Sequence, residues 1–230
     1  MRIWDINPGY LNDKSLLGEH VELHGLVSII VNNKKGYSNH PETKRWVDFP
    51  WALNKRHQLL CSEMKLRGFN HMSPLIIKNN EQNWPQEYID VPSDQFKILF
   101  DKYKNKKKGR IPLPDSAQKI WSHHKYSIMA RDLNEYKKIG RSVSNIKPND
   151  PFSSLVVDLI ELMKAKPLKG GLRNALQHMW GYFKKDNLVD IDVESLSLIE
   201  LLNIIQKLAY QKKEKYILES TALSDFEVWV

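Results

Sequence analysis

The spacing of apolar residues predicts that the chain is helical along most of its length. Near the start, one apolar stripe with spacings of seven, four and three consists of Leu16, Leu23, Val27 and Ile30. Such spacing brings side chains to one face of a helix, and Asp13 is the predicted N-cap of this helix. Polar and turn-forming residues then fill positions 32–41, so a loop is expected there.

Later segments repeat this alternation of helices and breaks. A second helix is predicted over residues 50–67 with Gly68 as its stop, whereas the proline and asparagine pairs of residues 70–92 predict irregular chain. Further helices are predicted over residues 93–103, 116–130, 134–144, 152–164, 172–185 and 193–213. The last of them carries a stripe with a spacing of three, made up of Leu196, Ile199, Leu202, Ile205 and Leu208. The predicted fold class is therefore all-α.

The composition is that of an ordinary globular protein. Of the 230 residues, 41% are hydrophobic and 27% are charged, enough for one large domain or two small ones. No apolar run approaches the roughly 18 residues of a membrane span, and the N-terminus has no signal-peptide core, so a cytoplasmic location is expected. The single cysteine, Cys61, excludes an internal disulfide and a cysteine-cluster zinc site, and its apolar neighbours predict a core position.

The positive charge is concentrated in the middle of the chain. Residues 101–150 contain 13 lysine and arginine residues against 5 aspartate and glutamate residues, while the rest of the chain holds 22 of each. This segment accounts for the whole net charge of +8, and its densest part is the run KYKNKKKGR at residues 102–110. Taken alone, such a run is typical of a solvated linker. In a nucleic-acid enzyme it would neutralise phosphates without reading sequence.

Two groups near the start of the chain are candidates for chemistry, the α-amine of Met1 and the carboxylate of Glu22. An α-amine has an ordinary pKa of about 7.7 to 8.0, so a fraction of it is an unprotonated nucleophile at neutral pH. Because Arg2 is not a small residue, we expect Met1 to be retained. Glutamates on an amphipathic helix are most often solvated, so these residues alone do not distinguish a catalytic from a surface role.

Four separated motifs carry a resemblance to a known family. They are MRI at residues 1–3, LLGEHVEL at 16–23, LNKRHQLL at 53–60 and LRGFN at 66–70. In this order they resemble the phage endonuclease V family of pyrimidine-dimer DNA glycosylases. The resemblance implies an all-α glycosylase and abasic-site (AP) lyase that acts through the amine of its first residue. It assigns the nucleophile to Met1, the following arginine to Arg2 and the essential glutamate to Glu22.

The chain differs from the phage enzyme around this glutamate. The phage enzyme carries arginines at the positions of Val21 and Gly25, and a histidine at the position of Ser15. His20 and His24 are the nearby groups that could take over substrate contacts, although imidazoles are largely uncharged at pH 7.

Further substrate contacts are expected from residue types. Lys34, Lys35 and Tyr37 in the predicted loop 32–41 offer positive charge and an aromatic ring to a nucleic acid, although a plain surface loop is equally consistent with them. In the helix predicted over residues 50–67, Lys55, Arg56 and His57 lie away from most apolar positions and are expected to line a DNA-facing groove.

The second half of the chain has a different character. Two prolines within residues 109–114 mark the predicted boundary. Beyond it, SHHKYSIMARD at 122–132, YKKIGR at 136–141 and KGGLRNALQHMWGYF at 169–183 resemble the YbgA-like domain, over residues 116–216. That resemblance implies association with nucleic acid and no particular reaction. No carboxylate or cysteine lies at ligand spacing from His123, His124 or His178, so no metal site is predicted. The pair Gly170-Gly171 could leave backbone amides open to a phosphate.

Two domains are therefore predicted, an endonuclease V-like DNA glycosylase/AP lyase domain at 1–110 and a YbgA-like helical domain at 111–230. The expected partner is damaged double-stranded DNA, with RNA as a second partner of the C-terminal domain, and no metal, organic cofactor or membrane is expected. Two alternatives stay open: a non-catalytic nucleic-acid-binding protein, and an enzyme acting on RNA or on a modified nucleobase. A lysine such as Lys55 or Lys125 could also replace Met1 as the imine-forming group.

Overall fold

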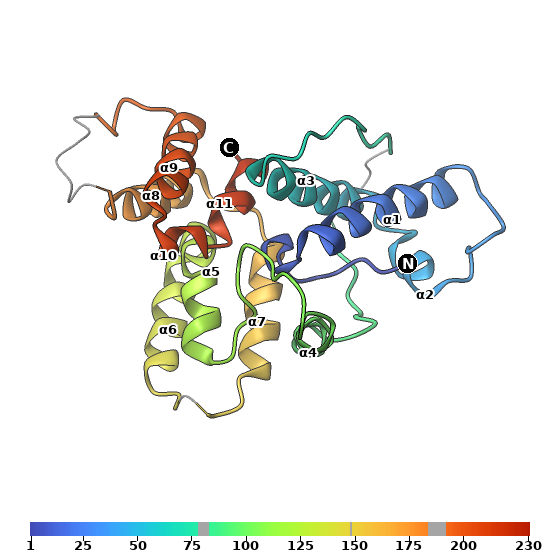
Figure 1. Cartoon of the computed structure of the whole chain (residues 1–230), viewed down its shortest axis with the longest axis horizontal. Helices are drawn as coiled ribbons and strands as arrows, with labels where there is room; N and C mark the ends of the chain where they lie inside the picture. Colours follow the sequence, from blue (N-terminus) through green and yellow to red (C-terminus); the bar gives the residue numbers. More distant parts are fainter. Residues whose placement is uncertain (78–82, 148, 184–191) are drawn as a thin grey trace. The chain divides into compact units, whose positions relative to one another are not determined.

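Helices account for the regular secondary structure in the computed structural model of the chain (Figure 1). The structure describes residues 1–77, 83–147, 149–183 and 192–230, and in these residues no strand occurs, which confirms the predicted all-α class. None of the helices in this described part combines the length and the hydrophobicity that a membrane-crossing segment requires. The predicted turn at Asn79-Asn80 and the last two residues of the helix predicted over 172–185 lie outside the described residues.

The chain divides into two compact units, Met1–Gly109 and Arg110–Val230. The described helices of the first unit are η1 (Pro8–Tyr10), α1 (Asp13–Val31), α2 (Pro41–Trp46), α3 (Pro50–Leu66) and α4 (Pro92–Lys102). α1 and α3 pack against each other (Figure 1). The predicted apolar stripe of α1 buries Leu16 and Leu23 completely. α3 likewise buries Leu53 and Leu60, so apolar burial between these two helices stabilises the unit.

Two helix starts differ from the prediction. Asn12, and not Asp13, caps α1, because its side chain accepts a hydrogen bond of 2.9 Å from the backbone N–H three residues later. Asp13 instead occupies the first turn, where a negative charge is favourable.

The sequence does not predict α2, which is too short for an apolar stripe. It begins with Pro41 and is capped by His40, whose Nδ1 accepts from the amide of Glu42 at 3.1 Å.

The N-terminal segment contributes to the core of the first unit. Ile3, Ile6 and Tyr10 are buried, and the ring of Tyr10 meets the ring of Phe96 edge-on at 4.8 Å between centroids. Gly109, the last residue of the unit, packs against the backbone of this segment. A Cβ atom at Gly109 would lie 2.5 Å from the carbonyl oxygen of Tyr10, so this approach requires glycine.

The second unit is built around α5. Its described helices are α5 (Ala117–Arg131), α6 (Leu133–Ser144), α7 (Ser153–Lys164), α8 (Lys169–Trp180), α9 (Leu198–Lys212), α10 (Lys215–Leu218), α11 (Ala222–Asp225) and η3 (Phe226–Val228). α5 packs against α6, α7 and α8 (Figure 1). A Cβ atom at Gly171 of α8 would lie 2.2 Å from the carbonyl oxygen of Ala130, so this glycine permits the close packing of α8 on α5.

The apolar stripe of α9 follows the true helical period and departs from the predicted spacing of three. Leu202 and Ile205 are fully buried as expected, but Ile199 is 38% exposed. Leu201, outside the predicted stripe, is fully buried. A turn contains 3.6 residues, so a stripe with a spacing of three drifts around the helix. The helix also starts later than predicted, at Leu198, and a capping box stabilises this start.

Candidate active site at the start of the chain

The first residues of the chain are held by a row of side-chain acceptors. The backbone N–H groups of four successive residues donate to side-chain oxygens: Arg2 to Glu22 (2.6 Å), Ile3 to Glu42 (3.0 Å), Trp4 to Glu19 (3.0 Å) and Asp5 to Gln95 (2.9 Å). The acceptors come from α1, α2 and α4, so three helices of the unit hold this segment. Each bond satisfies a backbone amide that a non-helical segment would otherwise leave without a partner. The folded unit therefore defines the position of Met1.

A buried ion pair supports this arrangement. Arg56 of α3 donates from Nε and Nη2 to the two oxygens of Glu19, at 2.7 Å each, and from Nη1 to the carbonyl oxygen of Ile6 at 2.7 Å. The side chains of Arg56 and Glu19 are 3% and 0% exposed. A bidentate pair with additional hydrogen bonds can hold two charges away from water. The pair joins α1, α3 and the N-terminal segment.

The amine of Met1 lies beside the carboxylate of Glu22. The amine nitrogen is 4.0 Å from Oε1 of Glu22, while Oε2 of the same side chain accepts the amide of Arg2. The Glu22 side chain is 43% exposed, so the carboxylate reaches the surface. An amine next to a carboxylate can attack an electrophilic carbon while the carboxylate moves a proton. The structure thus brings together the two residues that the resemblance assigns to catalysis.

The side chain of Arg2 is engaged within the unit. Its Nη2 lies 2.7 Å from Oδ2 of Asp90, and its guanidinium lies 4.9 Å from the centre of the Trp4 ring system. Both members of the ion pair are about one third exposed. A phosphate that binds Arg2 therefore has to compete with Asp90.

The loop after α1 presents the predicted phosphate and stacking groups at the surface. Lys34 donates to Oγ of Ser28 at 2.8 Å, and Tyr37 is 71% exposed with a left-handed φ of 59°. Lys34 and Lys35 help to line a hollow of about 290 Å³. α1 ends at Val31, nine residues after Glu22, which corresponds to about 14 Å along the helix axis. That length equals roughly four nucleotides of one strand.

The three residues of α3 that were expected to line a groove differ in position, and His57 is buried in a histidine cluster. Lys55 is partly exposed, donates to Oε1 of Gln58 at 2.9 Å and lies 5.9 Å from the Trp51 ring centre. Arg56 is buried in its pair with Glu19, so the structure contradicts the prediction that Arg56 contacts DNA. The prediction assumes one buried face, whereas α3 also buries polar side chains against the rest of the unit.

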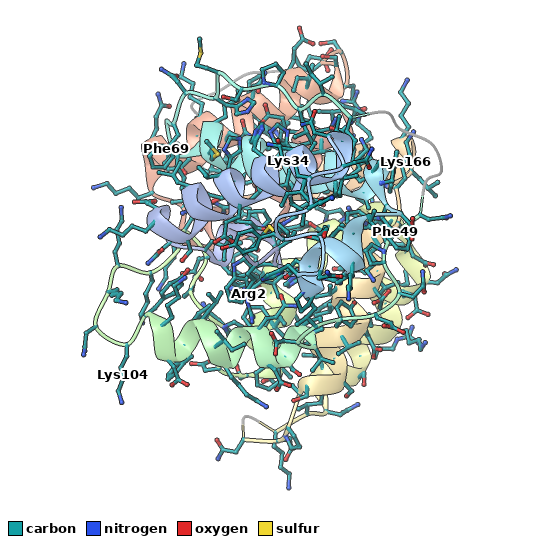
Figure 2. All side chains as sticks on the ribbon, turned by 90° about the vertical axis from the view of Figure 1, so that its right-hand side faces the viewer. Arg2, Lys34, Phe49, Phe69, Lys104 and Lys166 are labelled. Carbon is teal, nitrogen blue, oxygen red and sulfur yellow. The ribbon has the colours of Figure 1, made fainter. Side chains whose placement is uncertain are left out.

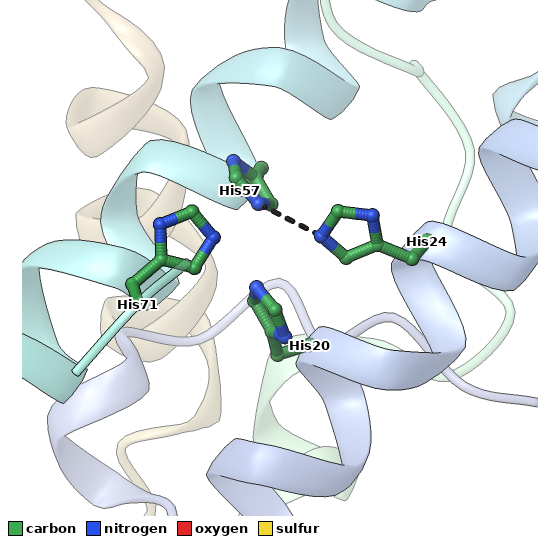
Figure 3. Close-up of side chains that lie close together, drawn as sticks. All are labelled: His20, His24, His57 and His71. Atoms are coloured by element: carbon green, nitrogen blue, oxygen red, sulfur yellow. Dashed lines mark hydrogen bonds between the residues drawn. The ribbon is translucent and has the colours of Figure 1, made fainter. Parts of the chain in front are cut away.

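His20 and His24 lie in a cluster that the sequence does not predict. Among the described residues, their rings meet those of His57 and His71 (Figure 3), and Nε2 of His24 lies 3.1 Å from Nε2 of His57. Burial lowers the pKa of His20 and of His57 to about 4, and it also lowers the pKa of His24. Neutral imidazoles supply no charge for phosphates, so His20 and His24 are poor replacements for the arginines of the phage enzyme.

The lysine-rich segment after α4 is exposed. The side chain of Lys104 extends away from the protein (Figure 2), and the neighbouring Lys102, Lys106 and Lys108 are also exposed. Lys107 forms an ion pair of 2.7 Å with Asp13 at the start of α1. The segment therefore carries positive charge on the surface of the first unit, as expected for either a solvated end or a phosphate contact.

Comparison with known proteins supports both resemblances. Residues 1–77 match the family model "Pyrimidine dimer DNA glycosylase". The match covers Met1, Glu22 and the four clustered histidines, and it associates this glycosylase-like segment with DNA repair and a DNA substrate. Residues 125–226 match "Protein of unknown function (DUF1722)", which corresponds to the YbgA-like half. Searches of curated proteins and of solved structures found no match.

The histidines and the candidate lysine of the DUF1722 half lie in different surroundings. His124 is buried and its Nδ1 donates to the carbonyl oxygen of Ile120 at 2.9 Å, whereas His178 is exposed on α8. The ammonium of Lys125, a candidate imine-forming group, lies 4.6 Å from the ring centres of both Tyr126 and Tyr216. Such contacts hold the cation against aromatic faces.

Proposed function

We propose that the protein is a DNA glycosylase and AP lyase whose nucleophile is the α-amine of Met1 and whose acid–base group is Glu22. The observation that carries the proposal is the 4.0 Å distance between the amine nitrogen and Oε1 of Glu22, in a segment that matches the pyrimidine dimer DNA glycosylase family. The proposed substrate is double-stranded DNA that contains a pyrimidine dimer, another damaged nucleotide or an abasic site.

In the glycosylase step, the Met1 nitrogen forms a bond to C1′ of the damaged nucleotide. The glycosidic bond breaks, and the leaving base takes its electron pair and then a proton. Loss of a proton from the nitrogen and opening of the sugar ring give an imine between Met1 and C1′. Glu22 stabilises the positive charge that develops at C1′ and accepts the proton. At an existing abasic site, the amine condenses with the sugar aldehyde and releases water.

In the lyase step, a base removes a proton from C2′ of the imine. The electrons form a double bond, the C3′–O bond breaks, and the strand leaves with its phosphate. Water then hydrolyses the remaining imine and regenerates the amine of Met1. Glu22, which is adjacent to the amine and 43% exposed, is the proposed base.

The anchored N-terminal segment supports this role by fixing the nucleophile before the substrate arrives. A free chain terminus would lose conformational freedom on reaching the reactive position, and that loss would raise the barrier. Here the amides of residues 2–5 are already bound, and Arg56 keeps Glu19 in place as one of the acceptors. The proposed nucleophile, the Met1 amine, is thus oriented by the folded unit before a substrate binds.

The surface lysines are the proposed DNA contacts. Lys34 and Lys35 in the loop, Lys55 on α3 and the exposed lysines of residues 102–108 neutralise phosphates, and Tyr37 offers a ring for stacking. The nucleophile has to reach C1′ inside a duplex, so the nucleotide must be displaced from the helix. This displacement costs a few kcal/mol and is easiest at a lesion.

Strand cleavage of two duplexes, one with an abasic site and one with a pyrimidine dimer, tests the proposal. We expect the wild-type protein to cleave at least the abasic duplex. Two extra residues before Met1 would displace the amine by about 7 Å and should abolish cleavage. The same two residues added after Val230 are the matched control and should leave cleavage unchanged. Cleavage by the N-terminally extended protein would contradict the role of the Met1 amine.

A second candidate function is recognition of nucleic acid without dimer excision. Val21 is 68% exposed and Gly25 is exposed, so the two positions that hold arginines in the phage enzyme carry no charge here. Steep salt dependence of DNA binding, together with no cleavage of either duplex, would favour this candidate. Competition between abasic DNA and a structured RNA would separate it from an enzyme that acts on RNA. For the DUF1722 half we propose a supporting role in nucleic-acid association.

A further inference from the structure

Four histidine rings converge in the first unit, at a place that the proposed reaction does not use. Within the described residues, His20 and His24 come from α1, His57 comes from α3, and His71 comes from the segment that follows α3 (Figure 3). Each ring offers one nitrogen, and these nitrogens all lie within 4.8 Å of one another. Several ring centroids are about equally spaced, from 4.6 Å for His20–His24 to 5.2 Å for His20–His57.

Local structure explains how residues distant in sequence meet here. His20 and His24 are four positions apart, so they lie on the same face of α1. The packing of α1 on α3 brings His57 to that face. Gly68, with a left-handed φ of 81°, ends α3 and reverses the chain, and the amide of the next residue donates back to the carbonyl of Met64 at 2.9 Å. This turn carries His71 back to the cluster.

The hydrogen bonding of the cluster is incomplete. Nε2 of His20 and Nε2 of His71 are buried without a hydrogen-bond partner. Nε2 of His24 and Nε2 of His57 face each other at 3.1 Å, so one of them must donate to the other. A buried polar atom without a partner destabilises a fold, and the four nitrogens face one another instead of carbonyls or carboxylates. A cation with empty orbitals would satisfy all four nitrogens together.

We propose that His20, His24, His57 and His71 bind one divalent transition-metal ion, with Zn²⁺ as the ion that fits best. Neutral imidazole is a common ligand of first-row transition metals, and four nitrogen ligands suit the tetrahedral preference of Zn²⁺. Zn–N bonds of about 2.0 to 2.1 Å place tetrahedral ligand atoms about 3.4 Å apart. The observed separations of 3.1 Å to 4.8 Å bracket this value.

Four protein ligands leave no open coordination position, so the ion is structural. It ties α1, α3 and residues 69–77 together. Glu22 lies two positions from both His20 and His24, which is about 200° around the helix, so it faces away from the ion. The sulfur of Cys61 lies 3.6 Å from Nε2 of His57 and is a neighbour of the four ligands.

Metal binding by the full chain tests this proposal without any activity assay. The protein is purified without a histidine tag, stripped with a chelator and titrated with Zn²⁺ against a chromophoric chelator. We expect one ion per chain, a rise in melting temperature on binding, and the visible absorption of tetrahedral cobalt when Co²⁺ replaces Zn²⁺. We also expect bound Zn²⁺ to slow chymotrypsin cleavage after Phe69.

Single substitutions identify the ligands. Since changes outside the ligand shell already weaken metal sites by about 10-fold to 100-fold, H71Q should weaken binding by about 100-fold or more. H71Q is the most informative variant, because His71 lies outside any helix and its loss should leave the helical circular dichroism unchanged. H178Q, at the exposed histidine of α8, is the matched control and should still bind one ion. C61S should also bind one ion.

Three results would overturn the proposal. The first is wild-type protein that binds no Zn²⁺ or Co²⁺ at micromolar concentrations. The second is H71Q that binds as tightly as wild type. The third is loss of the ion in H178Q, which would assign the binding to another site.

Discussion

The two sides of helix α1 use opposite kinds of polar group. On one side, Glu22 and Glu19 are carboxylates whose oxygens accept backbone amides of the N-terminal segment. On the other side, His20 and His24 turn neutral rings toward two further rings. The carboxylates find their donors within the protein, whereas the ring nitrogens include buried atoms without a partner.

This difference separates two roles, nucleophile positioning and metal binding, that lie within about one and a half turns of the same helix. The carboxylate side needs no added group, because amides and Arg56 satisfy it, and it positions an amine at the surface. The histidine side is complete only with a cation. Substitutions on the carboxylate side should therefore change the reaction, and substitutions on the histidine side should change metal binding.

The largest expected effect is on the reaction. E22Q keeps the shape of the side chain but removes its charge, so it should lower AP-site cleavage by roughly 100-fold to 10,000-fold. Zn²⁺ binding should stay as in wild type, because Glu22 is outside the ligand set. E87Q, at an exposed glutamate of the same unit, is the control. Equal cleavage by E22Q and E87Q would remove Glu22 from the reaction.

The buried ion pair on the carboxylate side should matter for stability. R56M leaves Glu19 buried without its partner and should lower the free energy of unfolding by about 3 to 5 kcal/mol. The double variant R56M/E19Q removes the stranded charge and should recover part of this loss. Denaturant unfolding measures both, with R141M at an exposed arginine as the control. An R56M protein as stable as wild type would show that the pair does not hold the N-terminal segment.

The second unit contains two buried histidines, His123 and His124, that can be compared with the histidine cluster of the first unit. Burial lowers the pKa of His123 to about 3 and of His124 to about 4, so both are neutral in the folded second unit. In the unfolded chain, each of these imidazoles binds a proton below its ordinary pKa of about 6.5. The stability that the two neutral histidines contribute is therefore fully present above that pH and is lost as the pH falls toward 4. H124Q should flatten the pH dependence of the melting temperature by the equivalent of about 1 to 3 kcal/mol. H178Q, at the exposed histidine of α8, is the control.

The smallest expected effect comes from adding charge beside Glu22. A Cβ atom at Gly25 meets nothing within 4 Å and Val21 is exposed, so V21R/G25R should fold normally. Each new phosphate contact should steepen the slope of log affinity against log salt concentration by about one. The affinity itself should rise about tenfold at low salt. V31R, at the far end of α1, adds charge away from Glu22 and is the control. If V31R improves binding to dimer DNA as much, the gain is non-specific.

The sequence predicts one side of α1 far better than the other, for physical reasons. Met1 and Glu22 belong to short local motifs, and helical spacing alone places Glu22 on the flank of the apolar stripe. The histidine cluster depends on the turn at Gly68 and on the packing of α1 on α3, neither of which appears in local spacing. The pair His20 and His24, four positions apart, is the one signal that could have suggested it.

The errors on α3 and α2 have related causes. Residues away from the apolar positions of a helix are expected in water, but Arg56 is buried because Glu19 and the carbonyl of Ile6 satisfy its charge. A short helix such as α2 depends on its cap and on tertiary packing, so hydrophobic periodicity does not reveal it. Helices α3 and α5, by contrast, begin and end within one residue of their predicted bounds.

Reductive trapping tests the central claim most directly. The protein is incubated with an abasic-site duplex and sodium borohydride, which converts an imine into a stable secondary amine, and the adduct is then mapped by peptide mass analysis. We expect one DNA adduct, on the nitrogen of Met1, and a large loss of adduct in E22Q. An adduct on a lysine, or no adduct with any damaged duplex, would contradict the central claim.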